Sequence, residues 1–178
     1  MKEKKCKHCK DKFAPIHFNQ KFCFKDECKN VWIETEKEKQ WRKRKKKMQE
    51  NLQTVQELMK ATQKIFNAYI RERDKGKPCI SCGRTELKKV NAGHYFSSGG
   101  HKNVTFNEDN VHLQCEYCNQ YLSGNLLNYQ IGIEKRIGGE RLLTLHEEAH
   151  KPRKYTREEL KELMKEYKEK LKILKSKK

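Results

Sequence analysis

The chain has 178 residues, of which 34% are hydrophobic and 37% are charged, and its formal net charge is +18 at pH 7. This composition excludes a large apolar core and predicts one small domain, or a small core with helical extensions. The charge indicates a polyanionic partner, with nucleic acid as the first candidate. A membrane surface is the weaker alternative, because the basic stretches lack an apolar face rich in Trp, Phe or Leu.

No apolar run approaches the length of about 18 residues that a membrane span needs, and the first residues are charged. We therefore expect no membrane span and no signal peptide, and a cytoplasmic protein. The chain carries eight cysteines, in two groups of four. Cytosolic thiols stay reduced, so these groups predict metal sites rather than disulfides.

The first group of cysteines has the spacing C-x2-C followed by C-x4-C. Four thiolates can close a tetrahedral zinc site. We predict an N-terminal four-cysteine zinc finger in residues 1–30; the alternative is a set of reduced thiols without metal. The ligands of this structural zinc would be Cys6, Cys9, Cys23 and Cys28.

No proline or glycine occurs between Lys29 and Asp74, which predicts one long helix, assigned to residues 31–75. Its first half is strongly basic, with eight Lys or Arg residues between Lys37 and Lys47. Such a run is a solvated helix face, a disordered arm or a surface for phosphates, and the net charge favours phosphates. The DNA-binding residues predicted here are Arg42, Lys43, Arg44, Lys45, Lys46 and Lys47.

Two segments repeat apolar residues at steps of three and four, which is typical of a packing face on a helix. The second segment follows a capping box at Thr156 to Glu159 and belongs to the C-terminal helices predicted in residues 131–178. The two seams either pack on each other within one chain or support a homodimer. They consist of Leu52, Val55, Met59, Thr62, Phe66 and Tyr69, and of Leu160, Met164, Tyr167, Leu171 and Leu174.

The second group of cysteines forms two C-x2-C knuckles separated by 32 residues, more than a plain zinc ribbon needs. The inserted segment carries His94 and Asn110, and Asn119 follows the second knuckle directly. We expect a strand up to Tyr95, a returning strand from Val111, and a helix after the second knuckle. The ligands of this second structural zinc would be Cys79, Cys82, Cys115 and Cys118.

A strand, a loop, a strand and a helix held by zinc resemble the ββα-metal, or HNH-like, nuclease finger, here assigned to residues 76–130. Phosphodiester hydrolysis needs a base near neutral pH and a divalent cation. The resemblance implies that His94 is the general base, that Asn110 orients it, and that Asn119 binds Mg²⁺ or Mn²⁺. The plainer alternatives are a strand cap, a turn and a helix cap. Lys102, in the intervening loop, is assigned to DNA contact.

Two positions depart from this pattern. Many members carry an acidic residue or a histidine just before the catalytic histidine, where this chain has Gly93. The basic residue often found three positions after the helix ligand is replaced by Leu122. The predicted cation site is therefore incomplete, and Asn91, a loop residue or water would have to supplement it.

Several ungapped blocks occur in order along the chain: Phe66–Asp74, Pro78–Gly83, Ala92–Tyr95, Phe106–Glu108, Cys118–Gln120 and Ser123–Leu126. They resemble the phage NinG/Rap recombination family, over nearly the whole chain. The resemblance implies a structure-specific endonuclease for branched recombination intermediates, notably Holliday junctions and D-loops. It would act in the host cell cytoplasm if the chain is encoded by a phage. A four-way junction is cut at two symmetry-related places, which favours a homodimer.

These patterns predict an α+β, mainly helical chain, in which a zinc-stabilised ββα-metal finger is joined to the N-terminal four-cysteine finger by long basic helices. Two other functional classes stay open. One is a non-catalytic, zinc-containing DNA-binding recombination accessory protein, and the other is an RNA-binding or assembly factor. Metal-dependent nicking that requires His94 would separate the nuclease from both.

Overall fold

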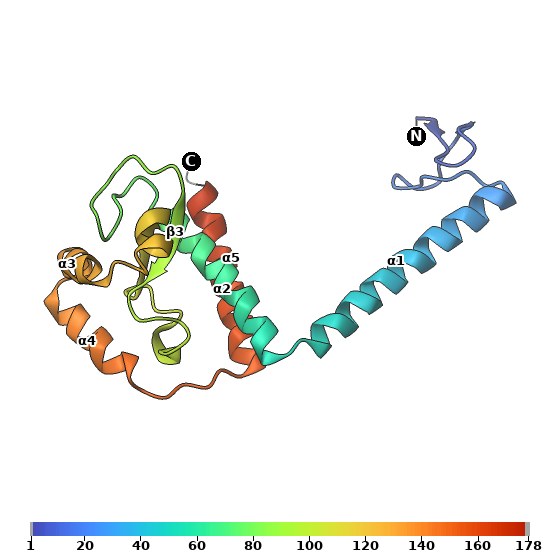
Figure 1. Cartoon of the computed structure of the whole chain (residues 1–178). Helices are drawn as coiled ribbons and strands as arrows, with labels where there is room; N and C mark the ends of the chain where they lie inside the picture. The colour runs from blue at the N-terminus through green and yellow to red at the C-terminus, as the bar shows by residue number, and fades with distance from the viewer. Residues whose placement is uncertain (1, 177–178) are drawn as a thin grey trace. The chain divides into compact units, whose positions relative to one another are not determined.

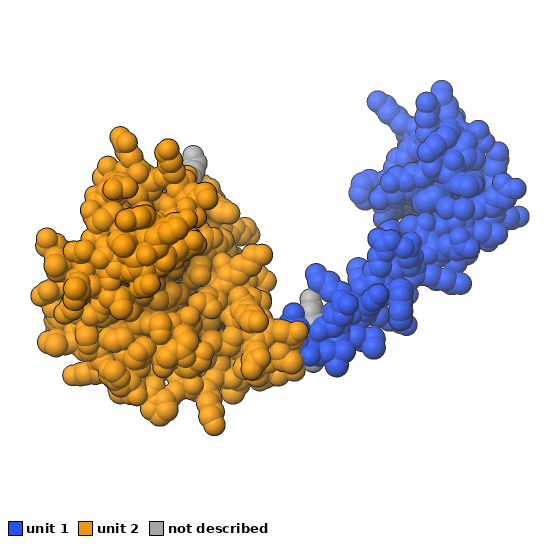
Figure 2. Space-filling view, viewed as in Figure 1, with its two compact units in different colours: residues 1–53 blue, residues 54–178 orange. Residues whose placement is uncertain are grey.

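The computed structural model describes residues 2–176 and divides into two compact units, residues 1–53 and 54–178 (Figure 2). The predicted α+β, mainly helical composition is confirmed. The elements, in chain order, are β1 (Lys4–Lys5), β2 (Lys12–Phe13), α1 (Asp26–Leu52), α2 (Val55–Arg73), β3 (Val90–His94), η1 (Lys102–Val104), β4 (Val111–Cys115), η2 (Tyr117–Tyr121), α3 (Leu126–Ile137), α4 (Gly139–Ala149) and α5 (Arg157–Ser176).

The first unit is built on the N-terminal cysteines. Strands β1 and β2 form a two-stranded antiparallel sheet, and the small core consists of cysteines with Phe13 and Phe22. Helix α1 begins two residues before Cys28 and carries Asp26 and Glu27 in its first turn, where carboxylates stabilise a helix. The rest of α1 is almost entirely exposed. The first unit therefore has little apolar core beyond the cysteine cluster.

The prediction of one continuous helix from Lys29 to Asp74 is wrong, because the helix breaks between Leu52 and Val55. Thr54 starts α2 with a capping box. Its backbone N–H donates to the Glu57 carboxylate (2.8 Å), and its hydroxyl accepts from the Glu57 N–H (3.2 Å). These bonds satisfy helix-terminal donors and favour a new start at this point. The break makes Leu52 77% exposed and removes it from the predicted seam.

The second unit is organised around the contact between α2 and α5, which lie side by side (Figure 1). Phe66 on α2 packs edge-to-face against Tyr167 on α5, with ring centroids 4.7 Å apart, and against Phe106 at 5.7 Å. The two apolar seams thus pack on each other within one chain, as the first alternative predicted. The capping box at Thr156 is confirmed, with its N–H 2.8 Å from the Glu159 carboxylate.

The antiparallel hairpin of β3 and β4 pairs Gly93 with His112 and His94 with Val111. The end of α2 anchors this hairpin. The buried carboxylate of Asp74 accepts from the Leu113 N–H (3.1 Å) and pairs with Arg73 (2.8 Å). Burial opposes the charge of Asp74, but Arg73, Lys77 and the Leu113 N–H lower its pKa to about 2. The carboxylate is therefore ionised at neutral pH and ties the hairpin to α2.

A second core lies between the hairpin and the helices α3 and α4 (Figure 1). It includes Ile80 of the first knuckle and Tyr129 of α3, both buried. A side chain at Gly132 would collide with the carbonyl oxygen of Ile80, so glycine allows α3 to approach the knuckle closely. None of the helices in residues 2–176 combines enough length and hydrophobicity to cross a lipid bilayer.

Candidate active site and metal centres

The eight cysteines converge in the two predicted groups of four, and within each group all sulfur atoms lie within 4.8 Å of one another. Zinc with a metal–sulfur distance of about 2.3 Å requires sulfur atoms roughly 3.8 Å apart. The Sγ atoms of Cys9 and Cys23 are 3.7 Å apart, and those of Cys82 and Cys115 are 3.8 Å apart. Both clusters therefore fit a structural zinc ion.

Hydrogen-bond donors around the central cluster point at its sulfur atoms and favour thiolates, the form that binds a cation. The Cys115 N–H points at the sulfur of Cys79 (3.3 Å), and the Asn125 amide points at that of Cys118 (3.5 Å). Burial opposes ionisation of Cys79, but nearby backbone N–H donors lower its pKa to about 7. Burial, partly offset by the Asn125 amide, raises the pKa of Cys118 to about 12. Four thiolates at this site thus require a bound metal.

His94 is the last residue of β3 and is half-buried. Its Nε2 lies 3.2 Å from the carbonyl oxygen of Thr105, in the loop between the strands. A carbonyl can only accept, so this contact places the imidazole proton on Nε2 and leaves Nδ1 as the basic nitrogen. Burial lowers the pKa of His94, and the carbonyls of Thr105 and Ala92 act in the opposite direction. The imidazole is therefore neutral at pH 7.

Asn110 is fully buried and bonds backbone groups of the loop, not the imidazole of His94. Its Oδ1 accepts from the Phe96 N–H (2.7 Å), and its Nδ2 donates to the carbonyls of Phe96 and Val104, both at 3.0 Å. The amide thus joins Phe96, two residues after His94, to Val104, the residue before Thr105. A direct hydrogen bond to His94, as expected from the sequence, is replaced by this indirect link through Thr105.

Asn119 lies in the π-helix η2 and belongs to a chain of amides. Its Nδ2 donates to Oε1 of Gln114 (3.0 Å), and its Oδ1 accepts from Nδ2 of Asn91 (3.2 Å). Gln114 is fully buried and donates in turn to the Ser81 hydroxyl (2.7 Å) and the Gly124 carbonyl (2.6 Å). These bonds fix the orientation of Asn119. An amide oxygen has a second lone pair, so Oδ1 can still bind a cation.

The same amide explains the glycine before His94. A Cβ at Gly93 would lie 3.0 Å from both Cβ and Cδ of Gln114 and still closer to its Oε1. The space that an acidic side chain at this position would use is thus filled by Gln114 from the neighbouring strand. The glycine at position 93 is thus explained by the buried Gln114, which occupies the space beside it. The sequence patterns did not predict this role of Gln114.

The structure does not bring His94 and Asn119 into contact. Side chains alternate along a strand, so Asn91 and Gly93 share one face of β3 and His94 belongs to the other. Within residues 2–176, the two cysteine clusters are the convergent groups of three or more His, Cys, Asp or Glu side chains. Asn119 offers one neutral oxygen to a hard cation, which fits Mg²⁺ or Mn²⁺ only if water and DNA phosphates supply the other ligands.

The other central histidine, His112 of β4, is buried. Burial, followed by the charge of Arg73, lowers its pKa to about 3. Its backbone N–H donates to the Tyr129 hydroxyl (3.1 Å), which donates to the Gly93 carbonyl (2.8 Å). His112 and Tyr129 therefore support the strand that carries His94. No signal in the sequence indicated this burial, because alternation with the apolar Val111 and Leu113 predicts a polar side for His112, whereas all five residues of β4 are buried.

The predicted DNA-binding residues are exposed but lie in different units. Arg42 to Lys47 occupy α1 in the first unit, and every one of these side chains is exposed. Lys102 lies in the loop of the second unit, where its Nζ donates to the Ser98 carbonyl (3.1 Å). On either side of Asn119, the exposed rings of Tyr117 and Tyr121 stack with centroids 6.0 Å apart. Positive charge and exposed aromatic rings are thus available to a nucleic acid.

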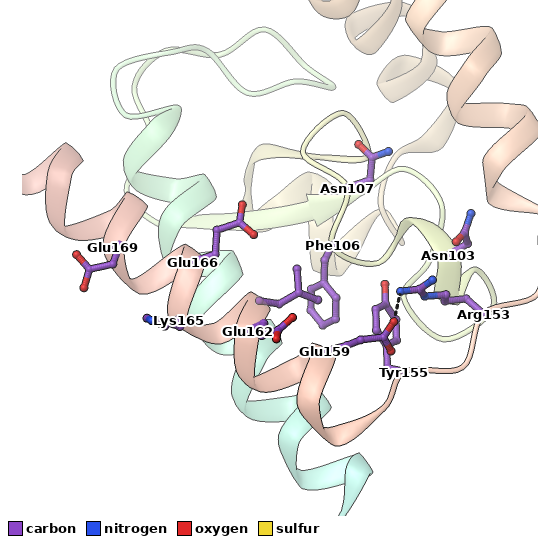
Figure 3. A pocket seen from close by; sticks show the side chains of 11 residues that line it. Asn103, Phe106, Asn107, Arg153, Tyr155, Glu159, Glu162, Lys165, Glu166 and Glu169 are labelled. Carbon is purple, nitrogen blue, oxygen red and sulfur yellow. Dashed lines mark hydrogen bonds and ion pairs between the residues drawn. The ribbon is translucent and has the colours of Figure 1, made fainter.

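A cavity of about 770 Å³ lies elsewhere, between α5 and the loop that contains Phe106 and Asn107 (Figure 3). Four glutamates of α5 line it, against Lys165 and Arg153, and Arg153 pairs with Glu159 (2.8 Å). This negative lining repels phosphates. DNA is therefore not expected to lie over this face of α5. The four glutamates are Glu159, Glu162, Glu166 and Glu169.

Comparison with known proteins identifies relatives over the whole chain. The family described as NinG, Bacteriophage Lambda NinG protein, matches residues 1–177. "Protein ninG" of Escherichia phage 933W is 34% identical over 190 aligned positions, covering 97% of this chain and 94% of that protein. "Protein ninG" of Escherichia phage lambda is 42% identical over 118 residues, 66% of this chain and 57% of that protein. The aligned part thus spans little more than half of the lambda protein. No solved structure matches the chain.

Proposed function

This chain belongs to the NinG family of bacteriophage proteins, and on this basis we propose that it is an HNH-like, Rap-type endonuclease. It would cleave branched DNA, notably Holliday junctions and D-loops, by metal-dependent phosphodiester hydrolysis. The observation that carries this proposal is the position of His94. Its imidazole is neutral and held by the Thr105 carbonyl at the end of a strand in a hairpin bracketed by the central cysteine cluster.

In this proposal, Nδ1 of His94 takes the proton from the attacking water, because Nε2 already donates to Thr105. The Asn110 amide fixes the loop that presents the Thr105 carbonyl, so it positions His94 indirectly. The lowered pKa of His94 keeps the base unprotonated at neutral pH. The fully buried Asn110 would therefore act as a positioning residue, not as a catalytic one.

The proposed cation ligand is Asn119, which Asn91 and Gln114 orient. A divalent cation, when bound, neutralises charge that develops on the phosphodiester and its leaving oxygen. The hydrogen-bond partners that the structure gives the Asn119 side chain are amides, those of Asn91 and Gln114, so the negative charge at the cation is proposed to come from DNA phosphates. His94 and the Asn91 partner of Asn119 belong to opposite faces of β3, so the proposal requires the phosphodiester and a hydrated cation to lie at the end of the strand, where His94 is the last residue.

We predict that Asn119→Ala raises the Mg²⁺ concentration needed for half-maximal cleavage by about 10-fold or more, because one protein ligand is lost. Junction affinity without Mg²⁺ should not change. The measurement is cleavage rate as a function of Mg²⁺ concentration. Gln120→Ala, an exposed neighbour on the same turn, serves as the control. A Mg²⁺ dependence equal to that of wild type would exclude Asn119 as a ligand.

The DNA surface is proposed to include the basic run of α1. Residues 1–53 hold 17 Lys or Arg against eight Asp or Glu, so this unit carries half of the net charge. Each phosphate contact contributes a slope of about −0.9 to the logarithm of affinity against the logarithm of salt concentration. Changing Arg42 to Lys47 to glutamine should reduce that slope by up to ~5 and weaken binding to duplexes and junctions alike.

Equilibrium binding at several salt concentrations tests this prediction. The control is the pair Lys161→Gln and Lys165→Gln on α5, next to the glutamate-lined cavity, where no phosphate contact is expected. A basic-run variant that loses affinity only for junctions would instead make α1 a reader of DNA shape.

We also propose that the protein acts as a homodimer, because each chain has one His94 and a junction requires two cuts. The buried seams of α2 and α5 are occupied within the chain, so a dimer must use another surface. Sedimentation should show a species of twice the 21.4 kDa chain mass, alone or on junction DNA. A single species at the mass of one chain under both conditions would contradict the dimer.

The direct test of the proposed function is cleavage of a labelled four-way junction with and without Mg²⁺. The amide partners of Asn119 and the glycine at position 93 favour one competing function, a non-catalytic, zinc-containing DNA-binding accessory protein. That protein would bind the junction without nicking it under any metal condition.

A further inference from the structure

A second cavity, of about 630 Å³, lies in the first unit between the loop of residues 16–24 and one face of α1. From α1 it is lined by Lys29, Trp32, Glu36 and Lys39, whose spacing of three and four residues places them on one helix face. Its volume is typical of ligand pockets, roughly 300–1,000 Å³. The cavity is separate from the residues assigned to cleavage, since all of its lining belongs to residues 16–39.

Aromatic and apolar side chains form the walls of this cavity and are unusually exposed. Trp32 and Phe24 are each 50% exposed, and Ile16 is 62% exposed. A cluster of large apolar side chains exposed at a protein surface usually marks a binding site. The loop that carries Ile16 is held in place by Gln20, which accepts from the Ile16 N–H (2.9 Å) and donates to the Phe22 carbonyl (2.9 Å). The walls are therefore formed before a ligand arrives.

The charged residues around the cavity indicate which kind of ligand it binds. Lys21, Lys29 and Lys39 face a single acid, Glu36. Lys29 pairs with Asp26 (2.9 Å) and Lys39 pairs with Glu36, whereas Lys21 has no ion pair among the described residues. A zinc ion with four thiolates would add two negative charges nearby, but the first unit would remain strongly basic. A purely apolar ligand would not need these lysines. A nucleotide would use the apolar walls for its base and the lysines for its phosphates.

We propose that this cavity binds an unpaired DNA base, stacked on Trp32 or Phe24, with the flanking phosphate at Lys21. Stacking on aromatic rings combined with a basic rim is the general mode of single-strand binding. Paired bases cannot enter, because their faces are covered by their neighbours in the duplex. The cavity would thus give the first unit a preference for single-stranded segments, such as the displaced strand of a D-loop. The inference rests on the proposed function only in taking DNA as the ligand.

The test uses the two tryptophans of the chain, Trp32 and Trp41. In full-length Trp41→Phe protein, Trp32 is the reporter, and titration with oligothymidylate should quench its fluorescence. An abasic strand of equal length carries the same phosphates and should leave the fluorescence unchanged. Trp32→Ala should lower the affinity for oligothymidylate by about 5- to 100-fold and leave duplex affinity nearly intact. Ile33→Ala, exposed beside Trp32 but outside the cavity lining, is the matched control.

Equal quenching by the abasic strand, or an equal loss of duplex affinity in Trp32→Ala, would overturn the proposal. So would a Trp32 signal that changes with protein concentration in the absence of DNA, because a second chain would then fill the cavity. Lys21→Glu, at the exposed rim, should also weaken oligothymidylate binding and does not depend on the packing of Trp32. Binding is measured without divalent cations. Base stacking without junction cleavage would refute only the proposed nuclease, and cleavage without base stacking would refute only this inference.

Discussion

His94→Ala should reduce junction cleavage by about 10²- to 10⁴-fold, which is the usual contribution of a general base. Junction affinity should stay close to that of wild type, because the base contributes to the transition state and not to ground-state binding. His94 is half-buried with one hydrogen bond to Thr105, so the substitution removes little packing. Single-turnover cleavage and equilibrium binding on the same labelled junction measure the two quantities separately.

His150→Ala is the matched control, since His150 is exposed and lies outside the proposed site. The pH profile gives a second readout. Burial lowers the pKa of His94, so the wild-type rate should stay level at neutral pH and fall only as the pH drops below about 6.5. A His94→Ala protein that cuts like wild type would exclude this finger as the nuclease site.

Loss of the central zinc should unfold the hairpin and abolish both cleavage and the defined structure around it. Structural zinc contributes on the order of 10 kcal/mol in small sites, which is comparable to the whole stability of a domain. We expect two zinc ions per wild-type chain and one in Cys118→Ser. The measurements are elemental analysis and thermal unfolding, and a wild-type content of one zinc or none would refute the two-site prediction.

The N-terminal cluster provides the matched control for this experiment. Cys9→Ser should also leave one zinc per chain, but the unfolding of residues 54–178 should remain unchanged, because that unit has its own apolar cores. If both variants unfold the second unit equally, the two units depend on each other for stability. The two substitutions thus separate local from global effects of metal loss.

Much of the fold could be predicted from local patterns. The cysteine spacing predicted both clusters, and the periodic apolar residues predicted the facing sides of α2 and α5. The break before α2 was missed because the absence of proline and glycine was given more weight than the capping box at Thr54 and Glu57. The capping box was therefore a local signal for the break, but it conflicted with the absence of proline and glycine.

The details of the candidate site depended on contacts that sequence does not specify. Gln114 fills the space at Gly93 only because the strand register brings the two together. Asn110 supports His94 through the backbone of a 16-residue loop between the strands, and the hydrogen-bond partners in such a loop follow from its folded path. The sequence identified the candidate residues of the site, but only the tertiary structure shows their hydrogen-bond partners.

One assay decides whether this NinG-family chain hydrolyses branched DNA, as proposed. Wild-type protein is mixed with a labelled four-way junction or a linear duplex of the same sequence, in buffer with Mg²⁺ or in buffer from which Mg²⁺ is omitted, so that the structural zinc is retained. We expect nicks near the branch point only with the junction and only with Mg²⁺. Binding of the junction without any nick, in Mg²⁺ and in Mn²⁺ alike, would contradict this expectation and leave a DNA-binding accessory protein.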